Sequence, residues 1–244
     1  MVTFGTPPLR FAPSTMSVSL DRITDFLFTV PLFRELERSA VRGFAELTRE
    51  QRFAKGALIV SEGDAGDALY VVRSGEVKVV VGGEDGREVI LHVLGVGDHF
   101  GELALIDGRP RSAHVISTQA SSLLVLRRAD FRRQVAQNPQ VAWGLMLELS
   151  RRLRQADGTI GSLVLLDVPG RVAKVLLEHA TAGDPATLVK PLTHQTIAQM
   201  IGASRETVSR AMTEFQEKGL IAVQRRIVTI TDRASLEART RPRL

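Results

Sequence analysis

Residues 100–113, FGELALIDGRPRSA, set charged side chains into an otherwise largely apolar run. Glu102 is followed nine residues later by Arg111, and Ser112 comes directly after the arginine. An arginine and a serine hydroxyl can both donate hydrogen bonds to an anion, and a glutamate can accept one from a hydroxyl group. Gly101 lets the backbone approach a ligand closely. The pattern indicates a site for a small polar ligand, and the alternative is a structural ion pair between Glu102 and Arg111.

A second set of chemically capable residues lies in 193–219, THQTIAQMIGASRETVSRAMTEFQEKG. This stretch predicts a helix from Thr193, a turn at 201–203 and a second helix capped by Ser204, which is the layout of a helix-turn-helix. The apolar residues of the second helix face inward: Val208, Met212 and Phe215. The polar residues of its other side are Arg205, Glu206, Ser209 and Arg210.

This polar side has the groups that read DNA bases. Arginine can donate two hydrogen bonds to guanine, and glutamate can accept one from cytosine N4. The alternative is a solvated face with an internal pair between Glu206 and Arg210, which stand four residues apart on the helix.

Cysteine is absent, which excludes disulfides, thiolate nucleophiles and cysteine-ligated metal clusters. The five histidines are isolated and have no metal-ligand spacing, so we expect no metal site. We find no nucleophile or paired acid and base, and so we expect no enzymatic activity. No window reaches the ~18 unbroken apolar residues of a membrane helix. The first residues lack the apolar segment of a secretory signal, which favours a cytoplasmic protein.

The elements that must position these side chains change along the chain. After a helical start at about residues 20–49, six β-rich runs follow one another with glycines between them: ALIVS, ALYVVR, GEVKVVV, REVILHVL, AHVIST and SLLVLR. Short strands at such spacing predict an antiparallel barrel or roll. The fold class is therefore α+β, with an antiparallel β-roll ahead of a mainly helical C-terminal part.

From residue 139 to about 166 the pattern predicts one long helix. Its apolar positions alternate steps of four and three residues: Ala142, Met146, Leu149, Leu153, Ala156, Ile160 and Leu163. A strict seven-residue repeat is typical of a coiled-coil seam and favours a parallel homodimer, whereas packing on the protein's own roll is the alternative. Gly158 and Gly161 weaken the helix by ~1 kcal/mol each relative to alanine.

Proline and glycine at 169–170 end this helix and mark a boundary. We expect a disordered extension at 1–19, the roll with flanking helices at 20–138, a dimerisation helix and hinge at 139–168, and a DNA-binding domain at 169–244. The runs LIAV and IVTI near the end predict a hairpin with Arg225 and Arg226 at its tip. From residue 170 onward 12 Lys and Arg stand against 7 Asp and Glu, which suggests a polyanionic partner.

Five segments in the right order resemble the CRP/FNR family of bacterial transcription regulators: VPLF, EGDAGDALYVVRSGEVKV, FGELALIDGRPRSA, LDVPGRVAKVLL and GASRETVSRAM. The resemblance covers residues 25–235 approximately. It implies a cyclic-nucleotide-binding β-roll, a dimerising helix and a winged helix-turn-helix. The hairpin tip at Arg225 and Arg226 is then the wing, which lies near phosphates.

The resemblance also implies roles for the opening motif. Arg111 pairs with the cyclic phosphate, Ser112 and nearby backbone N–H groups bond the same oxygens, and Glu102 accepts from the ribose 2'-hydroxyl. The cyclic-nucleotide site we expect comprises Gly101, Glu102, Leu103, Arg111, Ser112, Ala156 and Asp157. In cAMP-binding members hydroxyl or amide side chains of the long helix contact adenine, whereas the aligned residues here are Ala156 and Asp157. Asp157 can accept from adenine or guanine, so the expected site selects the ribose phosphate and leaves both bases open.

At the DNA end, Arg205, Glu206 and Arg210 match the subgroup that reads TGTGA half-sites. Ser209 is the residue that the FNR subgroup carries beside its arginine. The resemblance implies double-stranded DNA with a TGTGA-N6-TCACA-like inverted repeat, a homodimer and RNA polymerase as partners, and cAMP as effector. The expected DNA contacts are Thr193, Ser204, Arg205, Glu206, Ser209, Arg210, Arg225 and Arg226. The alternatives are a regulator active without ligand and a cyclic-nucleotide-binding module with no regulatory role.

Overall fold

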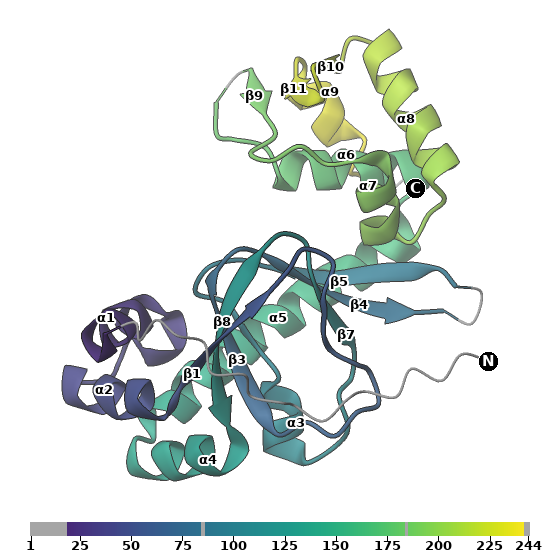
Figure 1. The fold of residues 1–244 in the computed structure, drawn as a ribbon. Coiled ribbons are helices and arrows are strands. Elements are labelled where there is room, and N and C mark those ends of the chain that lie inside the picture. The colour runs from purple at the N-terminus through teal and green to yellow at the C-terminus, as the bar shows by residue number, and fades with distance from the viewer. Residues whose placement is uncertain (1–18, 84–85, 184, 242–244) are drawn as a thin grey trace.

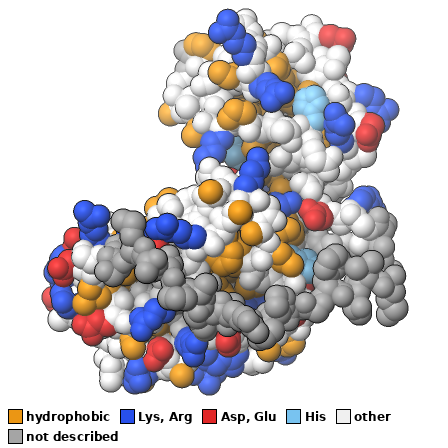
Figure 2. Space-filling view, viewed as in Figure 1, with side chains coloured by type: hydrophobic (Ala, Val, Ile, Leu, Met, Phe, Trp, Pro, Cys, Tyr) orange, Lys and Arg blue, Asp and Glu red, His pale blue; other side chains and the backbone are white. Residues whose placement is uncertain are grey.

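The computed structural model describes residues 19–83, 86–183 and 185–241. An N-terminal lobe (residues 19–138) and a C-terminal lobe (residues 168–241) are joined through one long helix, α5 (Figure 1). The space-filling view has a narrower waist between the lobes (Figure 2). The disordered extension predicted for 1–19 lies outside the described residues except for Ser19, which caps the first helix.

The predicted helical start is divided into three elements, α1 (Leu20–Thr29), a 3-10 turn η1 (Pro31–Phe33) and α2 (Arg38–Leu47). Pro31 is the first residue of the 3-10 turn. Proline has no N–H to continue the hydrogen bonds of α1, so α1 ends before it. Phe33 and Phe44 are buried with their ring centroids 4.9 Å apart. This contact joins the turn to α2.

The antiparallel roll predicted from the glycine-punctuated runs is confirmed. Its two four-stranded sheets have the strand orders β1-β8-β3-β6 and β2-β7-β4-β5. The strands are β1 (Arg49–Phe53), β2 (Leu58–Val60), β3 (Ala68–Ser74), β4 (Val77–Gly82), β5 (Glu88–Leu94), β6 (His99–Phe100), β7 (His114–Ser117) and β8 (Ser121–Arg127). The six runs correspond to β2, β3, β4, β5, β7 and β8, and the structure adds β1 and β6.

Strand β3 shows how the roll separates two cores. Successive side chains of a strand point to opposite faces. Ala68, Tyr70 and Val72 belong to the cluster inside the roll, whereas Leu69 and Val71 pack outward with the helices. Tyr70 stacks on Phe100 of β6 with ring centroids 4.8 Å apart. The inner face therefore carries an aromatic pair directly beside Gly101.

Helices α3 (Glu102–Asp107) and α4 (Arg128–Gln137) complete the N-terminal lobe, and α5 (Gln140–Leu165) follows it. Helix α5 runs without a break through Gly158 and Gly161. Ser162 Oγ donates to the Gly158 carbonyl at 2.6 Å, and Lys174 Nζ donates to the same oxygen at 3.1 Å. These bonds stabilise the helix where its glycines lower the intrinsic propensity.

Helix α6 (Val168–Glu178) is the first element of the C-terminal lobe. Asp167 caps α6, so Pro169 and Gly170 stand in its first turn, where proline is tolerated because the first N–H groups have no helical partner. The lobe continues with β9 (Ala186–Thr187), α7 (His194–Ile201), α8 (Arg205–Glu217), β10 (Ile221–Gln224), β11 (Ile227–Ile230) and α9 (Arg233–Ala238). Its sheet has the order β10-β11-β9.

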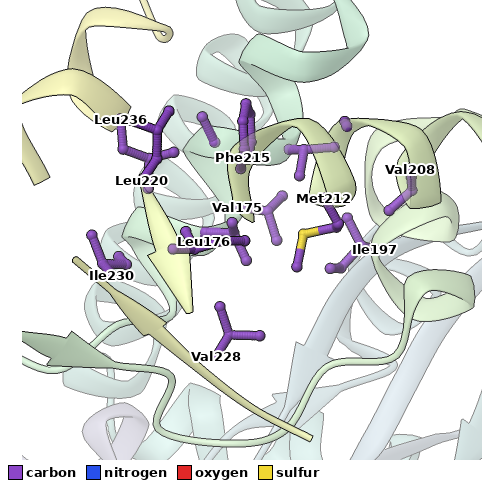
Figure 3. Close-up of a cluster of buried hydrophobic side chains, with 14 of the residues drawn as sticks. Val175, Leu176, Ile197, Val208, Met212, Phe215, Leu220, Val228, Ile230 and Leu236 are labelled. Carbon is purple, nitrogen blue, oxygen red and sulfur yellow. The ribbon is translucent and has the colours of Figure 1, made fainter. Parts of the chain in front are cut away.

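The core of this lobe confirms the predicted inward side of the second helix. Val208, Met212 and Phe215 are buried against Leu176 of α6 and Ile197 of α7 (Figure 3). Each is at most 2% exposed. Since these positions fix the rotation of α8, its polar side must face away from the lobe. Within the described residues, no helix is both long and apolar enough to cross a membrane.

Candidate functional site

Arg111 lies inside the roll with 7% of its surface exposed. Its Nη1 donates to the Gly101 carbonyl at 3.0 Å, and its Nη2 donates to the Ala68 carbonyl at 2.9 Å. The guanidinium carbon stands 5.6 Å from the centre of the Tyr70 ring. A guanidinium has five N–H donors, so the remaining ones are available to an anion. The positive charge is thus buried and held in position by backbone carbonyls, and no carboxylate of the described residues is hydrogen-bonded to it.

Two glycines make room for this guanidinium. A Cβ on Gly66 would stand 2.9 Å from Arg111 Nε, and a Cβ on Gly101 would stand 2.5 Å from Arg111 Nη1. Gly101 also has a φ of 91°, a left-handed conformation that side chains disfavour. Any larger residue at either position would displace the arginine.

Glu102 is 2% exposed and starts helix α3. Its Oε1 accepts from Nη1 of Arg152, a residue of α5, at 3.0 Å. The same arginine donates to the His99 carbonyl at 2.6 Å and to Glu148 Oε1 at 2.8 Å. The structure therefore pairs Glu102 with Arg152, and the alternative ion pair between Glu102 and Arg111 is wrong. Arg152 ties the long helix to the predicted ligand site.

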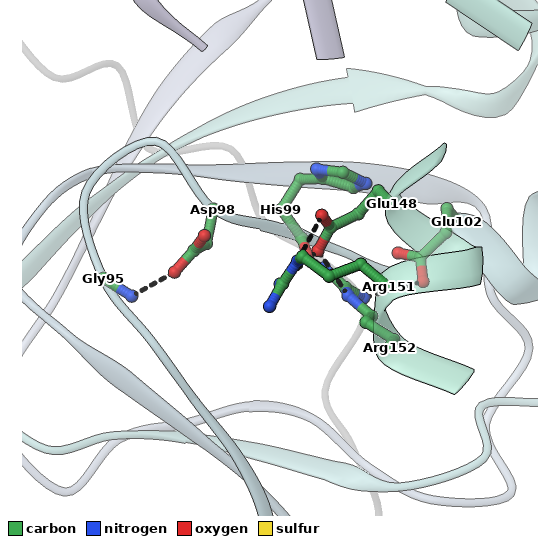
Figure 4. Close-up of polar contacts among 7 residues, drawn as sticks. All are labelled: Gly95, Asp98, His99, Glu102, Glu148, Arg151 and Arg152. Atoms are coloured by element: carbon green, nitrogen blue, oxygen red, sulfur yellow. Dashed lines mark hydrogen bonds and ion pairs between the residues drawn. The ribbon is translucent and has the colours of Figure 1, made fainter. Parts of the chain in front are cut away.

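The second carboxylate oxygen of Glu102 is buried and has no hydrogen-bond partner. Burial raises the pKa of Glu102, and the Arg152 guanidinium partly offsets that rise. An unpartnered buried acceptor is costly, so a hydroxyl donor from a ligand would be favourable at this oxygen. The arrangement of Glu102, Arg152 and Glu148 is drawn in Figure 4.

Glu148 anchors this network from α5. Burial alone would raise its pKa, but hydrogen bonds from Arg151 and Arg152 lower it to about 2. Arg151 binds both carboxylate oxygens, at 2.9 and 2.7 Å. The carboxylate is therefore ionised at neutral pH and fixes the Arg152 side chain for its contact with Glu102.

Two histidines flank the network. His99 pairs in register with Val71, whose side chain faces the helices, so its ring lies on the outer face of the sheet. Burial, together with the nearby Arg152, lowers the pKa of His99 to about 4, and its Nε2 has no hydrogen-bond partner. Burial and Arg152 also lower the pKa of His92 on β5. Strand β5 therefore lies close to the same arginine.

The other predicted ligand residues are more open. Leu103 is 46% exposed, and Ser112, Ala156 and Asp157 are exposed. Ala156 stands one helical turn after Arg152 and so shares its face of α5. In the single chain the buried part of the predicted site comprises Glu102 and Arg111 beside Gly101, and the residues predicted for the base remain uncovered.

Most of the predicted seam of α5 is also exposed, while Ala142 and Leu149 are half-buried. Met146, Leu153, Ile160 and Leu163 are 51%, 64%, 58% and 46% exposed. Further apolar side chains outside the strict repeat widen this surface: Trp143, Leu147, Val164 and Leu165. An apolar stripe of this length normally packs against another surface.

The helix-turn-helix has the caps that its sequence predicts. Thr193 accepts from the Thr196 amide at 3.0 Å at the start of α7, and Ser204 accepts from the Thr207 amide at 3.1 Å at the start of α8. Gly202, with a φ of 63°, ends α7. The turn therefore places α8 at a fixed angle to α7.

The polar side of α8 faces solvent. Arg205, Glu206 and Arg210 are exposed and Ser209 is half-buried. The pKa of Glu206 is lowered by a hydrogen bond from its own backbone N–H and by one from Ser204, so the residue is an ionised acceptor. The ion pair considered between Glu206 and Arg210 is not formed, because Arg210 instead donates to Thr207 Oγ1 at 3.3 Å.

The hairpin β10–β11 ends in a two-residue turn of Arg225 and Arg226. Their φ values of 49° and 68° are both left-handed, as a type I′ turn requires. Arginine is unusual there and adopts this conformation at a small energetic cost. Both side chains are exposed at the tip.

Sequence reasoning missed Arg152, Tyr70 and Gly66. Arg152 is one of several arginines on the long helix, and its only signal is its position one turn before Ala156. Tyr70 and Gly66 lie in the segment EGDAGDALYVVRSGEVKV, where the glycine spacing indicates strand ends.

Comparison with known families places two domains on the chain. Residues 50–138 match the cyclic nucleotide-binding domain, and residues 170–239 match the Crp-like helix-turn-helix domain. The chain is 34% identical over 222 residues to the CRP-like cAMP-activated global transcriptional regulator of Mycobacterium tuberculosis, covering 89% of this chain and 99% of that protein. It is 32% identical over 184 residues to the cAMP-activated global transcriptional regulator CRP of Escherichia coli O6:H1, covering 73% and 88%.

Solved structures share the fold. The Thermus thermophilus catabolite activator protein is 33% identical with a TM-score of 0.52, covering 86% of this chain and 98% of that one. The c-di-GMP responsive regulator CLP of Xanthomonas campestris is 23% identical with a TM-score of 0.70, covering 80% and 99%.

A cyclic nucleotide-binding domain joined to a helix-turn-helix defines a DNA-binding transcription regulator. The chain belongs to the CRP/FNR family of these regulators.

Proposed function

We propose that this protein is a homodimeric transcription regulator whose DNA binding is controlled by cAMP. The observation that carries the proposal is the buried pair of complementary groups inside the roll. Arg111 has free N–H donors, and Glu102 has an unpartnered oxygen. Buried charges are costly, so their retention is explained by a ligand that supplies a phosphate to the arginine and a hydroxyl to the glutamate.

The choice of cAMP rests on the relatives and on α5. The regulators from Mycobacterium tuberculosis and Escherichia coli are named as cAMP-activated, whereas the similarly folded CLP is named as responsive to c-di-GMP. The fold alone therefore does not select the base. Asp157 supplies an acceptor suited to the adenine N6 amine, and Ala156 leaves space beside it.

The uncovered seam of α5 supports the homodimer. Burying its apolar side chains against a second copy removes their surface from water. This stabilises the dimer by about 25 cal/mol per Å² of apolar surface buried. A parallel pairing of two α5 helices relates the two C-terminal lobes by a two-fold axis. An inverted repeat of DNA has the same symmetry, with half-sites ~34 Å apart.

The exposed side of α8 supports sequence-specific recognition of a TGTGA-N6-TCACA-like operator. Arg205 and Arg210 supply bidentate donors for guanine, and Glu206 supplies an acceptor for cytosine N4. Thr193, Ser204 and the wing arginines are placed for phosphates, which position the protein without reading sequence. RNA polymerase is the further partner that we infer from the family.

Calorimetry of the purified protein with cAMP and with cGMP tests the effector. We expect heat of binding for cAMP and weaker binding for cGMP. Tight binding of cGMP alone would reassign the base, and no binding of either nucleotide would favour a regulator that is active without ligand. The oligomeric state is measured in the same samples by light scattering.

A further inference from the structure

The C-terminal lobe contacts the roll at a place far from α5 in sequence. Helix α7 lies against strand β5 of the β4–β5 hairpin (Figure 1). Gln199 of α7 donates through Nε2 to Glu88 Oε2 on β5 at 3.1 Å. The same Glu88 oxygen accepts from Lys78 of β4 at 2.9 Å. The acceptor is thus held on the hairpin by its own strand partner.

A second contact joins the same two parts of the molecule. Lys190, in the segment that leads into α7, pairs with Glu76 in the turn between β3 and β4. Glu76 is mostly buried, and its Oε1 accepts from Thr118 Oγ1 at 2.9 Å. The acid is therefore fixed by the roll, whereas the Lys190 side chain is 66% exposed.

These contacts are polar, and they are weak. The apolar side chains of α7 are used within its own lobe, where Ile197, Ala198 and Ile201 are buried. Exposed ion pairs contribute little free energy and are screened by salt, and polar contacts between domains usually permit relative motion. The contact between α7 and β5 can therefore form and separate at low cost.

Strand β5 also carries His92, whose pKa is lowered by burial and by Arg152. Glu88 and His92 are four residues apart on β5, about 13 Å at 3.3 Å per residue. His92 lies within the electrostatic influence of Arg152, which holds Glu102. One strand therefore connects the partner of α7 with the side chains around Glu102.

We propose that the contacts of Glu88 with Gln199 and of Glu76 with Lys190 form a latch that holds the C-terminal lobe in a resting orientation. This inference rests on the proposed function. Cyclic nucleotide in the roll withdraws the hairpin from α7, and the two lobes of the dimer then turn to meet successive half-sites. The base-reading side of α8 stays exposed in the latched state. The latch therefore fixes the orientation of the C-terminal lobe and does not cover the residues that contact DNA.

Crosslinking tests the latch directly, because the chain contains no native cysteine. Glu88→Cys and Gln199→Cys are introduced together and joined by a short bismaleimide. The reagent spans the distance that the longer Glu88 and Gln199 side chains span in the native protein. Mass analysis separates crosslinks within one chain from crosslinks between chains. The untreated double variant and the two single variants, treated with the same reagent, serve as controls.

Binding of a TGTGA-N6-TCACA duplex is then measured at saturating cAMP. We expect the intramolecularly crosslinked protein to bind DNA at least about 10-fold more weakly than the untreated double variant. Its cAMP affinity should fall as well, because nucleotide binding and opening of the latch are coupled. Equal or tighter DNA binding by the crosslinked protein would overturn the latch. If the untreated protein fails to bind DNA, the proposed function fails instead. In that case the rate of crosslinking between the two cysteines tests the latch. We expect cAMP and salt to lower this rate. A constant rate would show that no latch opens.

A neutral variant gives an independent measurement. Glu76→Gln keeps an acceptor for Thr118 but removes the charge that faces Lys190. We expect ligand-free operator affinity to rise about 2- to 3-fold, with little change at saturating cAMP. Glu46→Gln on α2 removes the same charge from an exposed site away from the C-terminal lobe and is the matched control. The same rise in both variants, or no rise in Glu76→Gln, would contradict the latch.

Discussion

The roll and the helix-turn-helix both present arginine with glutamate, but they do so in opposite environments. Arg111 and Glu102 are 7% and 2% exposed, whereas Arg205 and Glu206 project into solvent. The buried groups are held by backbone carbonyls and by Arg152. The exposed groups are positioned by the caps and the apolar side of one helix. Arginine and glutamate are thus packed in the interior of the roll, whereas on α8 the same residue types make few contacts with the rest of the protein.

This difference has a physical consequence. Removing a buried charged group leaves its partners desolvated and unpaired, so function and stability change together. Removing an exposed side chain costs little stability, so only recognition changes. Substitutions in the two regions should therefore differ in their effect on stability.

Arg111→Ala is expected to have the largest effect. It removes the charge-assisted bonds to the cyclic phosphate, and we expect cAMP affinity to fall roughly 1,000-fold by calorimetry. The free energy of unfolding should also fall, because the Gly101 and Ala68 carbonyls lose their donors. Arg109→Ala changes a neighbouring exposed arginine and should leave both quantities unchanged. Retained cAMP affinity in Arg111→Ala would remove this arginine from the site.

His99 tests the buried region through pH. Its folded pKa of about 4 lies below the ordinary value of 6.5, so the unfolded chain binds more protons between these values. The contribution to stability is therefore present above pH 6.5 and is lost as the pH falls towards 4. His99→Phe should flatten this dependence by on the order of 2 kcal/mol between pH 7 and pH 4.5.

Urea unfolding of both proteins at several pH values, followed by fluorescence of the single tryptophan, measures the difference. Parallel pH profiles for the native protein and His99→Phe would contradict the assigned protonation of His99.

Arg205→Ala tests the exposed region. It should relax the preference at one G·C pair by about 1 to 3 kcal/mol, with the unfolding free energy unchanged. Competition binding with operators substituted at single positions measures the preference. Lys218→Ala, at the end of α8 and paired with Glu214, is the control that should keep full specificity. An unaltered base preference in Arg205→Ala would show that α8 does not read that pair.

Arg225→Ala should have the smallest effect. Loss of a wing arginine that contacts a phosphate lowers affinity for all sequences alike, and the slope of log affinity against log salt should decrease in magnitude by about 1. Fluorescence anisotropy over a series of salt concentrations gives the slope. A loss confined to one DNA sequence would instead assign this arginine to base reading.

The sequence predicted the elements that follow from local patterns. Ser204 and the spacing of Val208, Met212 and Phe215 predicted α8 correctly, because capping and 3.6-residue periodicity are local signals. The partner of Glu102 was not predictable, since Arg152 is 50 residues away and several arginines share its helix. The contact between α7 and β5 was not predictable either. Local patterns indicate the helix and the strand separately and carry no signal for a contact between two domains.

Pro169 and Gly170 show the limit of predicting helix boundaries from helix-breaking residues. They marked the end of the long helix, but the structure places both in the first turn of α6. Proline is compatible with a helix start as well as with a helix end.

We propose that ligand in the buried site of the roll controls DNA binding by the exposed side of α8. Fluorescence anisotropy of a labelled TGTGA-N6-TCACA duplex, with the protein titrated in the absence of cAMP and again at saturating cAMP, tests this control. We expect at least about 10-fold tighter binding with cAMP, and loss of that gain in Arg111→Ala. Equal affinity with and without cAMP, in protein shown by calorimetry to bind the nucleotide, would contradict it.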